Sequence, residues 1–170
     1  MIEFEWSDDD DDDDDDEEEE IPPQPPPSSV GTVLPDGTVE HRNAQGQLHR
    51  LDGPAVEGAD GTREWWVNDL RHRLDGPAFE GADGFRSWYQ NGLRHHLDGP
   101  AVEGARGSKE WYVNGFRHRL DGPAVEWADG TKGWYVNGLR HRLDGPAIEW
   151  ADGDKEWWVN GIRRPDRTGE

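Results

Sequence analysis

Histidines at a fixed step are the residues of this sequence best suited to chemistry. They occur every 23 residues, at His72, His95, His118 and His141. Histidine is the usual metal ligand and acid or base in proteins. Equivalent residues two strands apart in a sheet lie about 9.6 Å from one another. Because one metal ion cannot bridge that distance, we interpret each imidazole as packed on a neighbouring tryptophan ring, and we expect no metal site.

Other catalytic or metal-binding arrangements are equally weak. Calcium needs about six to eight oxygen ligands, but each recurring Asp-Gly pair offers one carboxylate, and we interpret "DGD" at Asp152–Asp154 as a turn. The chain has no cysteine, and Ser87 and Ser108 occur at unrelated places in their surroundings. We therefore expect no enzyme activity and no cofactor.

Arginines beside aromatic residues could stack on bases or bind phosphates. The positions are Arg71, Arg73, Arg94, Arg117, Arg119, Arg140 and Arg142. Neighbouring acids offer a simpler role as ion-pair partners, namely Glu64, Glu110 and Glu156. Because phosphate contacts dominate nucleic-acid affinity and the chain has a net charge of −20, we expect no nucleic-acid binding through the body of the protein.

Most of that charge sits in the first 30 residues. They hold 15 acids and no Lys or Arg, so the remaining chain has 38 − 15 = 23 acids against 18 bases. Asp8–Glu20 is an unbroken acidic run, which predicts a disordered arm, and the prolines of Ile21–Gly31 predict an extended spacer. No apolar stretch approaches the length of a membrane span and no signal peptide is evident, so we expect a cytoplasmic protein.

The body is a tandem repeat of 23 residues. Each of the five clear units begins in an Arg-Leu-Asp-Gly-Pro-Ala motif (with His in place of Arg at 96) and carries an Asp-Gly or Arg-Gly pair, a tryptophan and an Asn-Gly or Asn-Asp pair. The predicted units are 31–53, which is degenerate, then 54–76, 77–99, 100–122, 123–145 and 146–164, followed by a tail at 165–170. Atypical first and last units are typical of a stack of repeats, in which they act as caps.

The turn residues predict the secondary structure. Asp60-Gly61 and Asn137-Gly138 lie between apolar and aromatic runs, and both pairs favour two-residue type I′ hairpin turns. The Gly-Pro step should kink the longer strand. We therefore predict an all-β fold, a repeated antiparallel β-meander forming a single twisted sheet of roughly 10 to 12 strands.

These turns also predict the register. With a two-residue loop at Asp60-Gly61, Val56 would face Trp65 and Glu57 would face Glu64. The second turn would place Trp66 opposite Arg71 and Glu64 opposite Arg73. Alternation then predicts two faces. The apolar face would carry Val56, Trp65, Val67, Leu70 and His72, and the solvated face Glu57, Glu64, Trp66, Arg71 and Arg73. In the last two units Trp127 and Trp150 would stand on the apolar face, with the residues equivalent to Val56 and Trp65.

The unit resembles the MORN repeat. The match covers residues 31 to 164 and is carried by "KEWYVNGFRHRLDGPAVEWADGTKGWYVNG", residues 109–138, although Arg-Leu-Asp-Gly-Pro-Ala replaces the Gly-x-Gly step of that family. The resemblance implies a long twisted meander used for dimerisation, scaffolding or protein docking. Members of the family are also linked to membranes and phosphoinositides, but the acidic arm and body oppose anionic lipid, so we expect no membrane partner.

An uncovered apolar face predicts association. We expect a protein-binding or self-assembling scaffold, as a dimer or an open filament. The alternative is an acidic decoy whose arm occupies a basic, nucleic-acid-type site on another protein. The candidate partner-binding residues are Trp65, Trp88, Trp111, Trp127, Trp134, Trp150 and Trp157, with Ile2, Phe4 and Trp6 of the alternating segment "MIEFEW", which we expect to add as a strand to a sheet edge.

Overall fold

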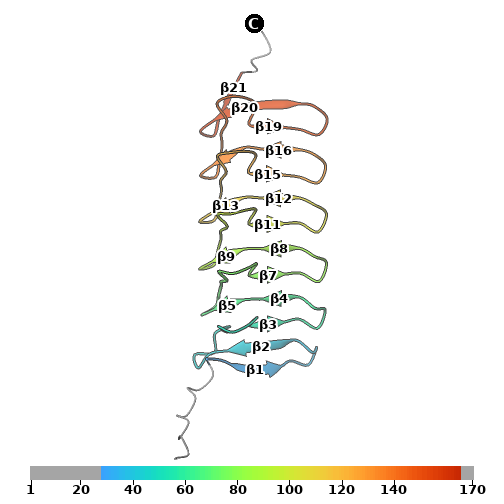
Figure 1. The fold of residues 1–170 in the computed structure, drawn as a ribbon, viewed down its shortest axis with the longest axis vertical. Helices are drawn as coiled ribbons and strands as arrows, with labels where there is room; N and C mark the ends of the chain where they lie inside the picture. The colour runs from blue at the N-terminus through green and yellow to red at the C-terminus, as the bar shows by residue number, and fades with distance from the viewer. Residues whose placement is uncertain (1–27, 166–170) are drawn as a thin grey trace, which may run out of the picture.

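The computed structural model describes residues 28–165 and is built of β-strands and turns alone (Figure 1). The predicted all-β, antiparallel repeat of hairpins is confirmed. Within residues 28–165 there is no helix, and therefore none long and apolar enough to cross a membrane. The predicted acidic arm lies almost wholly outside the described residues, as do Ile2, Phe4 and Trp6.

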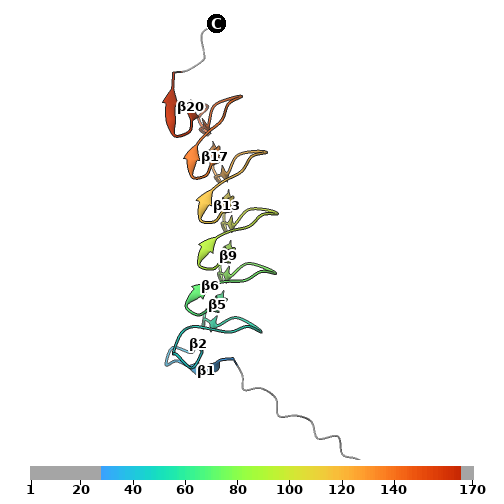
Figure 2. The same cartoon turned by 90° about the vertical axis from the view of Figure 1, so that its left-hand side faces the viewer.

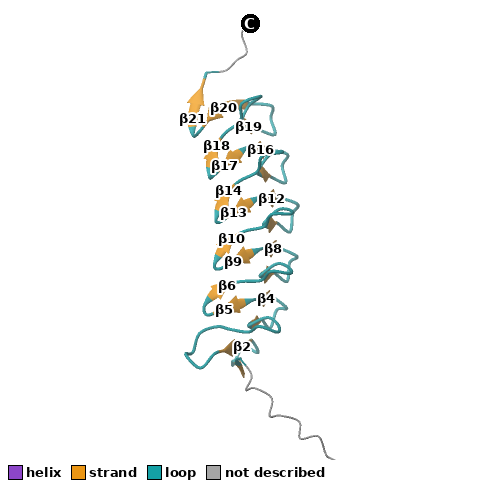
Figure 3. Cartoon of the chain, turned by 60° about the vertical axis from the view of Figure 1, so that its left-hand side comes forward, coloured by secondary structure: helices purple, strands orange, loops and turns teal. Residues whose placement is uncertain are grey.

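Thirteen strands form one antiparallel sheet, and their order across the sheet follows their order in the chain. They are β1 (Val30–Val33), β2 (Val39–Arg42), β3 (Val56–Glu57), β4 (Arg63–Glu64), β7 (Phe79–Glu80), β8 (Arg86–Ser87), β11 (Val102–Glu103), β12 (Lys109–Glu110), β15 (Val125–Glu126), β16 (Lys132–Gly133), β19 (Ile148–Glu149), β20 (Lys155–Val159) and β21 (Ile162–Arg164). In Figure 1 the strands from β1 to β19 lie across the long axis and follow one another from one end of the stack to the other, and Figure 3 shows that β21 runs along this axis.

Four shorter hairpins form a second row beside the main sheet. They are β5 (Trp66–Val67) with β6 (Leu70–Arg71), β9 (Tyr89–Gln90) with β10 (Leu93–Arg94), β13 (Tyr112–Val113) with β14 (Phe116–Arg117), and β17 (Tyr135–Val136) with β18 (Leu139–Arg140). Figures 2 and 3 show them in file along the long axis, one per unit. Each unit therefore adds two strands to the main sheet and one hairpin to the second row.

The Asn-Gly turns are two-residue turns, as predicted. Both central residues have positive φ, 49° at Asn91 and 79° at Gly92, which is the type I′ conformation. In the first hairpin Asn68 and Asp69 adopt the same conformation. Val67 faces Leu70 and Trp66 faces Arg71 in the resulting register, so this part of the predicted pairing is confirmed.

The prediction of a two-residue turn at Asp60-Gly61 is wrong. Gly58 accepts a hydrogen bond from the N–H of Gly61 at 2.9 Å and donates its own N–H to Thr62 at 2.8 Å. The loop therefore has three residues, with Gly61 in the left-handed conformation (φ 92°) that closes a type I turn followed by a bulge. Val56 consequently faces Glu64, not Trp65, and Glu57 faces Arg63, not Glu64.

This shift by one residue changes the predicted faces. Val56 and Glu64 stand on one face of the sheet, and Glu57 and Arg63 stand on the other, because paired residues share a face. The predicted grouping of Val56 with Trp65 is therefore wrong, since Trp65 follows Glu64 and points the opposite way.

The chain leaves the β-ladder of the main sheet near the Gly-Pro step, where a kink was predicted. The backbone N–H of Arg73 donates to Tyr89 O in the next unit at 3.1 Å. The predicted pairing of Glu64 with Arg73 is therefore wrong. Residues 74–77 form a loop that ends at Ala78, whose carbonyl accepts the N–H of Trp65 at 2.9 Å. Proline cannot donate to a ladder, and here it separates the main sheet from the second row of hairpins.

The core is thin and follows the stack. Its most buried positions are the alanines that follow each proline, Ala55, Ala78, Ala101, Ala124 and Ala147, each 0% exposed. Beside them pack two clusters, one of Val102 and Tyr112 and one of Val125, Tyr135 and Ile148. A small side chain is needed at each alanine because neighbouring strands and loops meet there.

Candidate protein-binding surface

Five leucines, one per loop, project into solvent along the stack. Each occupies the second position of the four-residue segments that we call the leucine loops: 50–53, 73–76, 96–99, 119–122 and 142–145. Their exposed fractions are 69% for Leu51, 74% for Leu74, 73% for Leu97, 79% for Leu120 and 73% for Leu143. A large apolar side chain exposed at every repeat is not expected unless something covers it.

An arginine fixes the position of the leucine in every loop except 96–99, which begins with His96. Arg73 donates from Nε to Asp75 Oδ1 at 2.9 Å, and from Nη1 to Pro77 O at 3.2 Å and to Glu80 Oε1 at 3.4 Å. The guanidinium therefore lies inside its own loop and the neighbouring Leu74 is turned outward. The hydrogen bond from Arg73 lowers the pKa of the Asp75 carboxyl below its ordinary value.

The same arginines stack on the predicted tryptophans. The guanidinium carbon lies 4.0 Å from the ring centroid in the pairs Arg73–Trp65, Arg119–Trp111 and Arg142–Trp134. In the remaining internal unit His96 replaces the arginine, and its ring lies parallel to that of Trp88 at 4.9 Å. One face of each of these four tryptophans is thus covered within the chain, and the rings form the half-buried base of the loops.

Hollows of similar lining lie between successive leucine loops. The hollow between loops 50–53 and 73–76 has a volume of about 550 Å³ and is lined by Trp65, Val67 and His72. The hollow between loops 96–99 and 119–122, with Trp111 in the place of Trp65, has a volume of about 450 Å³, and the one between loops 119–122 and 142–145, with Trp134, has a volume of about 570 Å³. Exposed leucines stand on both sides of each of these hollows, so leucines and hollows alternate from loop 96–99 to loop 142–145.

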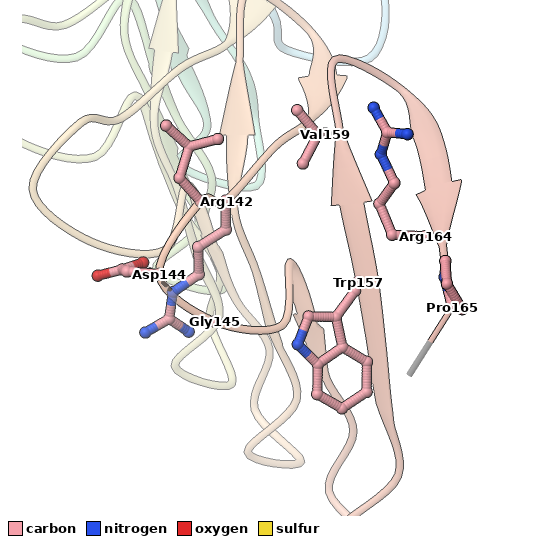
Figure 4. A pocket seen from close by; sticks show the side chains of 8 residues that line it. Arg142, Asp144, Gly145, Trp157, Val159, Arg164 and Pro165 are labelled. Carbon is pink, nitrogen blue, oxygen red and sulfur yellow. Dashed lines mark hydrogen bonds and ion pairs between the residues drawn. The ribbon is translucent and has the colours of Figure 1, made fainter. Parts of the chain in front are cut away.

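The hollow at the C-terminal end is larger and more enclosed than these three. It measures about 690 Å³ and lies between loop 142–145 and the strands β20 and β21 (Figure 4). Pro165 stands eight residues after Trp157, where an arginine follows the earlier tryptophans. Within residues 28–165 no guanidinium stacks on Trp157, and Figure 4 shows the Arg164 side chain apart from the ring. This half-buried tryptophan therefore lacks the stacked guanidinium of Trp65, Trp111 and Trp134, and its ring lines the hollow.

The repeated histidines connect neighbouring units. Nδ1 of His72 lies 3.0 Å from Asn91 Oδ1, and the backbone N–H of Asn91 donates to the same nitrogen at 3.2 Å. The same contact recurs in the pairs His49–Asn68, His95–Asn114, His118–Asn137 and His141–Asn160. Each imidazole thus contacts the turn of the next hairpin, a partner that the sequence reasoning did not identify. In the described part of the chain no group of three or more His, Asp or Glu side chains is placed to hold a metal ion.

The glutamate–arginine pairs brace the opposite face. Glu64 Oε2 accepts hydrogen bonds from Arg71 Nη2 at 2.8 Å and from Trp66 Nε1 at 2.9 Å. Arg71 also lies over the Trp66 ring at 4.9 Å, as predicted. Glu110 pairs with Arg117 at 2.9 Å, and Glu156 with Arg140 at 3.5 Å. Arg71, Arg117 and Arg140 are therefore ion-pair partners of acids within the chain.

The surroundings of Trp127 differ from those of Trp150. Both rings were predicted to lie on one apolar face with residues of the Val56 and Trp65 type. Trp127 packs on the cluster of Val125, Tyr135 and Ile148, so it is a part of the core. Trp150 is 43% exposed. The prediction that both rings share the Trp65 face is wrong, because the register differs by one residue.

The leucines of the loops were used in the sequence reasoning only to count the repeats. Each of them recurs two residues before a Gly-Pro pair, in a loop that lies away from the core, and this position could have identified them as surface residues.

No family model matches the sequence, and no curated protein matches it either. The hairpin repeat agrees with what the MORN resemblance implies for the fold, and membership of that family stays a prediction.

Proposed function

We propose that this protein is a non-enzymatic β-repeat scaffold that binds another protein. Binding would use the leucine-loop surface, which we define as Leu51, Leu74, Leu97, Leu120 and Leu143 with the hollows between them. The observation that carries the proposal is the exposure of all five leucines, between 69% and 79%, at the same position of successive units.

Burial of the exposed leucines would favour binding of a partner to this surface. Full burial of a leucine side chain contributes about 1.5–3 kcal/mol, so covering several of them can support a stable complex after the cost of association. The surface is also preformed, because in four of the five loops an arginine donates to three acceptors at 2.9–3.4 Å. Little ordering entropy remains to be lost when a partner binds.

Self-association is a second form of the same proposal. β1 and β21 are the two edges of the main sheet, and Val30 and Val33 of β1 are 68% and 70% exposed. Edge strands with unpaired backbone groups are common points of contact between copies. Association through edges would leave the leucine loops uncovered, so the two forms can be separated by mutation.

The test compares three full-length proteins in pull-downs from the native extract, followed by repurification of any protein retained. The first is the wild type, the second carries Leu74→Asp, Leu97→Asp and Leu120→Asp, and the third carries Leu70→Asp, Leu93→Asp and Leu139→Asp. The third set is a matched control, because those leucines are also exposed, at 48–51%, but lie in the second-row hairpins. We expect the purified partner to bind the first and third proteins and to lose at least about tenfold in affinity for the second.

Two outcomes would contradict the proposal. Equal partner binding by all three proteins would exclude the leucine-loop surface. Loss of binding only after deletion of residues 1–30 would favour the acidic decoy instead. Light scattering of the same proteins measures self-association, which should depend on the sheet edges and not on the loop leucines.

A further inference from the structure

We propose that the ligand of the leucine-loop surface is a proline-rich segment in the polyproline II conformation. It would run along the stack, across the strands, and place every third residue in the three successive hollows between loop 96–99 and the C-terminal end. The inference rests on the proposed function, since it names the chemistry of the ligand for the same surface.

The repeat distance of the surface selects this conformation. Each unit adds two strands to the main sheet, so equivalent points in successive units are about 9.6 Å apart. A polyproline II helix has three residues per turn and a rise of about 3.1 Å, so its equivalent side chains recur every 9.3 Å or so. Over four units the mismatch accumulates to only about 1.2 Å, which is less than half the rise of one residue.

Other regular conformations fit the spacing poorly. In a β-strand three residues span about 10 Å, but the first and the fourth side chains point to opposite sides. In an α-helix 9.6 Å corresponds to about 6.4 residues, which is not a whole number of turns. Only the three-residue period returns the same face of the ligand to each hollow.

The lining of the hollows suits proline. Tryptophan and valine form the base of each hollow and leucines form its sides, as with Trp65, Val67 and Leu74. Proline rings pack on aromatic surfaces, and grooves lined by aromatic residues recognise polyproline II ligands, whose limited freedom lowers the entropy cost of binding. In this conformation backbone carbonyls have no internal partner, and the guanidinium of Arg164, which lines the C-terminal hollow, can donate to them.

The C-terminal hollow is the strongest anchor on this surface. It is the largest of the series, at about 690 Å³, and its Trp157 ring carries no stacked guanidinium within residues 28–165. A proline ring can therefore contact the Trp157 ring in this hollow, whereas at Trp65, Trp111 and Trp134 the stacked arginine already covers one face.

The chain itself contains a segment of the required composition. "IPPQPPP", residues 21–27, places prolines three residues apart at Pro22 and Pro25, and again at Pro23 and Pro26. It directly precedes the described part of the chain. This segment supplies the design of a probe, Pro-Pro-Gln triplets, that reproduces its composition and its period.

The experiment measures binding of synthetic Pro-Pro-Gln peptides of two, three, four and five triplets to the full-length protein, by calorimetry and tryptophan fluorescence. We expect the affinity to rise by about 100-fold or more from two to four triplets, because each added triplet engages another hollow at high effective concentration. A peptide of equal length and composition with its prolines out of the three-residue period is the first control, and a Gly-Ser peptide is the second.

Variants locate the site. Trp157→Ala should weaken binding of the triplet peptides at least about fivefold, and Leu97→Asp should remove the gain from added triplets, whereas Leu93→Asp in the second row should change neither. Circular dichroism of each variant verifies that the sheet is intact.

The results separate the two proposals. Triplet peptides that bind no better than the Gly-Ser peptide, or as well as the out-of-period peptide, would overturn the polyproline inference. The scaffold proposal would still stand if the purified partner lost affinity for the variant with Leu74→Asp, Leu97→Asp and Leu120→Asp. If that variant kept its partner while the triplets bound with the expected length dependence, the scaffold proposal would fail alone.

Discussion

The large side chain of Trp127 packs over Gly133, which has none. This packing can be tested by introducing at both positions the residues that another unit carries there. In the preceding unit the equivalent positions hold Gly104 and Glu110. A Cβ atom at Gly133 would lie 2.9 Å from Tyr135 Cε2 and 3.3 Å from Trp127 Cζ3. The indole therefore fills the space that a glutamate side chain occupies elsewhere.

Trp127→Gly alone should destabilise the protein by about 2–4 kcal/mol. A tryptophan buries about 150–250 Å², which at about 25 cal/mol per Å² corresponds to about 4–6 kcal/mol as an upper value. The real cost is smaller because Trp127 is only half-buried and because denatured chains already bury part of their apolar surface. Gly133→Glu alone should also destabilise, because its Cβ contacts Tyr135 and Trp127 too closely.

The double variant, Trp127→Gly with Gly133→Glu, should recover about 1–2 kcal/mol relative to Trp127→Gly. Without the indole the introduced carboxylate can accept hydrogen bonds from Arg140 and Tyr135. Glu110 accepts such bonds from Arg117 at 2.9 Å and from Tyr112 at 2.8 Å.

Thermal unfolding followed by circular dichroism measures the effect. Since 1 kcal/mol shifts the midpoint of a chain of this size by about 2–4 °C, Trp127→Gly should lower it by about 4–16 °C. Trp150→Gly is the matched control and should cost less, because Trp150 is 43% exposed. Additive effects of the two single substitutions, or an equal loss from Trp150→Gly, would refute the packing argument.

Three further predictions concern the turns, the core and the loops. Asn137→Ala should cost about 1.5–3 kcal/mol in urea unfolding, because it loses a hydrogen bond and strains a residue with φ 50°, whereas Asn137→Gly should cost less. Ala124→Val should cost about 1–3 kcal/mol in the same assay, since Ala124 is 0% exposed. Asp75 and Asp121 have lowered pKa values when folded, so their stabilising effect is complete above the ordinary value of 3.8 and is lost as the pH falls through the folded pKa. Replacing both with Asn should flatten the fall of the melting midpoint as the pH drops below about 4.

The two turns of each unit show what the sequence could predict about the fold. Asn-Gly admits one short hairpin geometry, and Asn91 and Gly92 adopt it. Ala-Asp-Gly is compatible with a loop of two residues or of three, and local residue types do not decide between them. A difference of one residue reverses every side chain that follows, so Val56 and Trp65 were assigned to the same face although they lie on opposite faces.

The shape of the leucine loops depends on hydrogen bonds of the arginine side chains, and the periodicity of the sequence does not predict these bonds. Alternation places residues within strands, but the leucine loops are shaped by one side chain, Arg73, bonded to acceptors up to seven residues away. The sequence identified Trp65 as a partner-binding candidate, yet that ring stacks on Arg73 and the exposed apolar residue is Leu74. A loop held by its own side chains can be described only after its three-dimensional contacts are known.

The orientation of the strands across the long axis has a mechanical consequence. Hydrogen bonds in an antiparallel ladder run perpendicular to the strands, and here that direction is the length of the stack (Figure 1). A pulling force on β1 and β21 would therefore load the strand pairs one after another, as in a zipper, and not all together in shear. The body should lengthen in steps of one unit at low force, so that it would yield gradually under tension between two anchored ends.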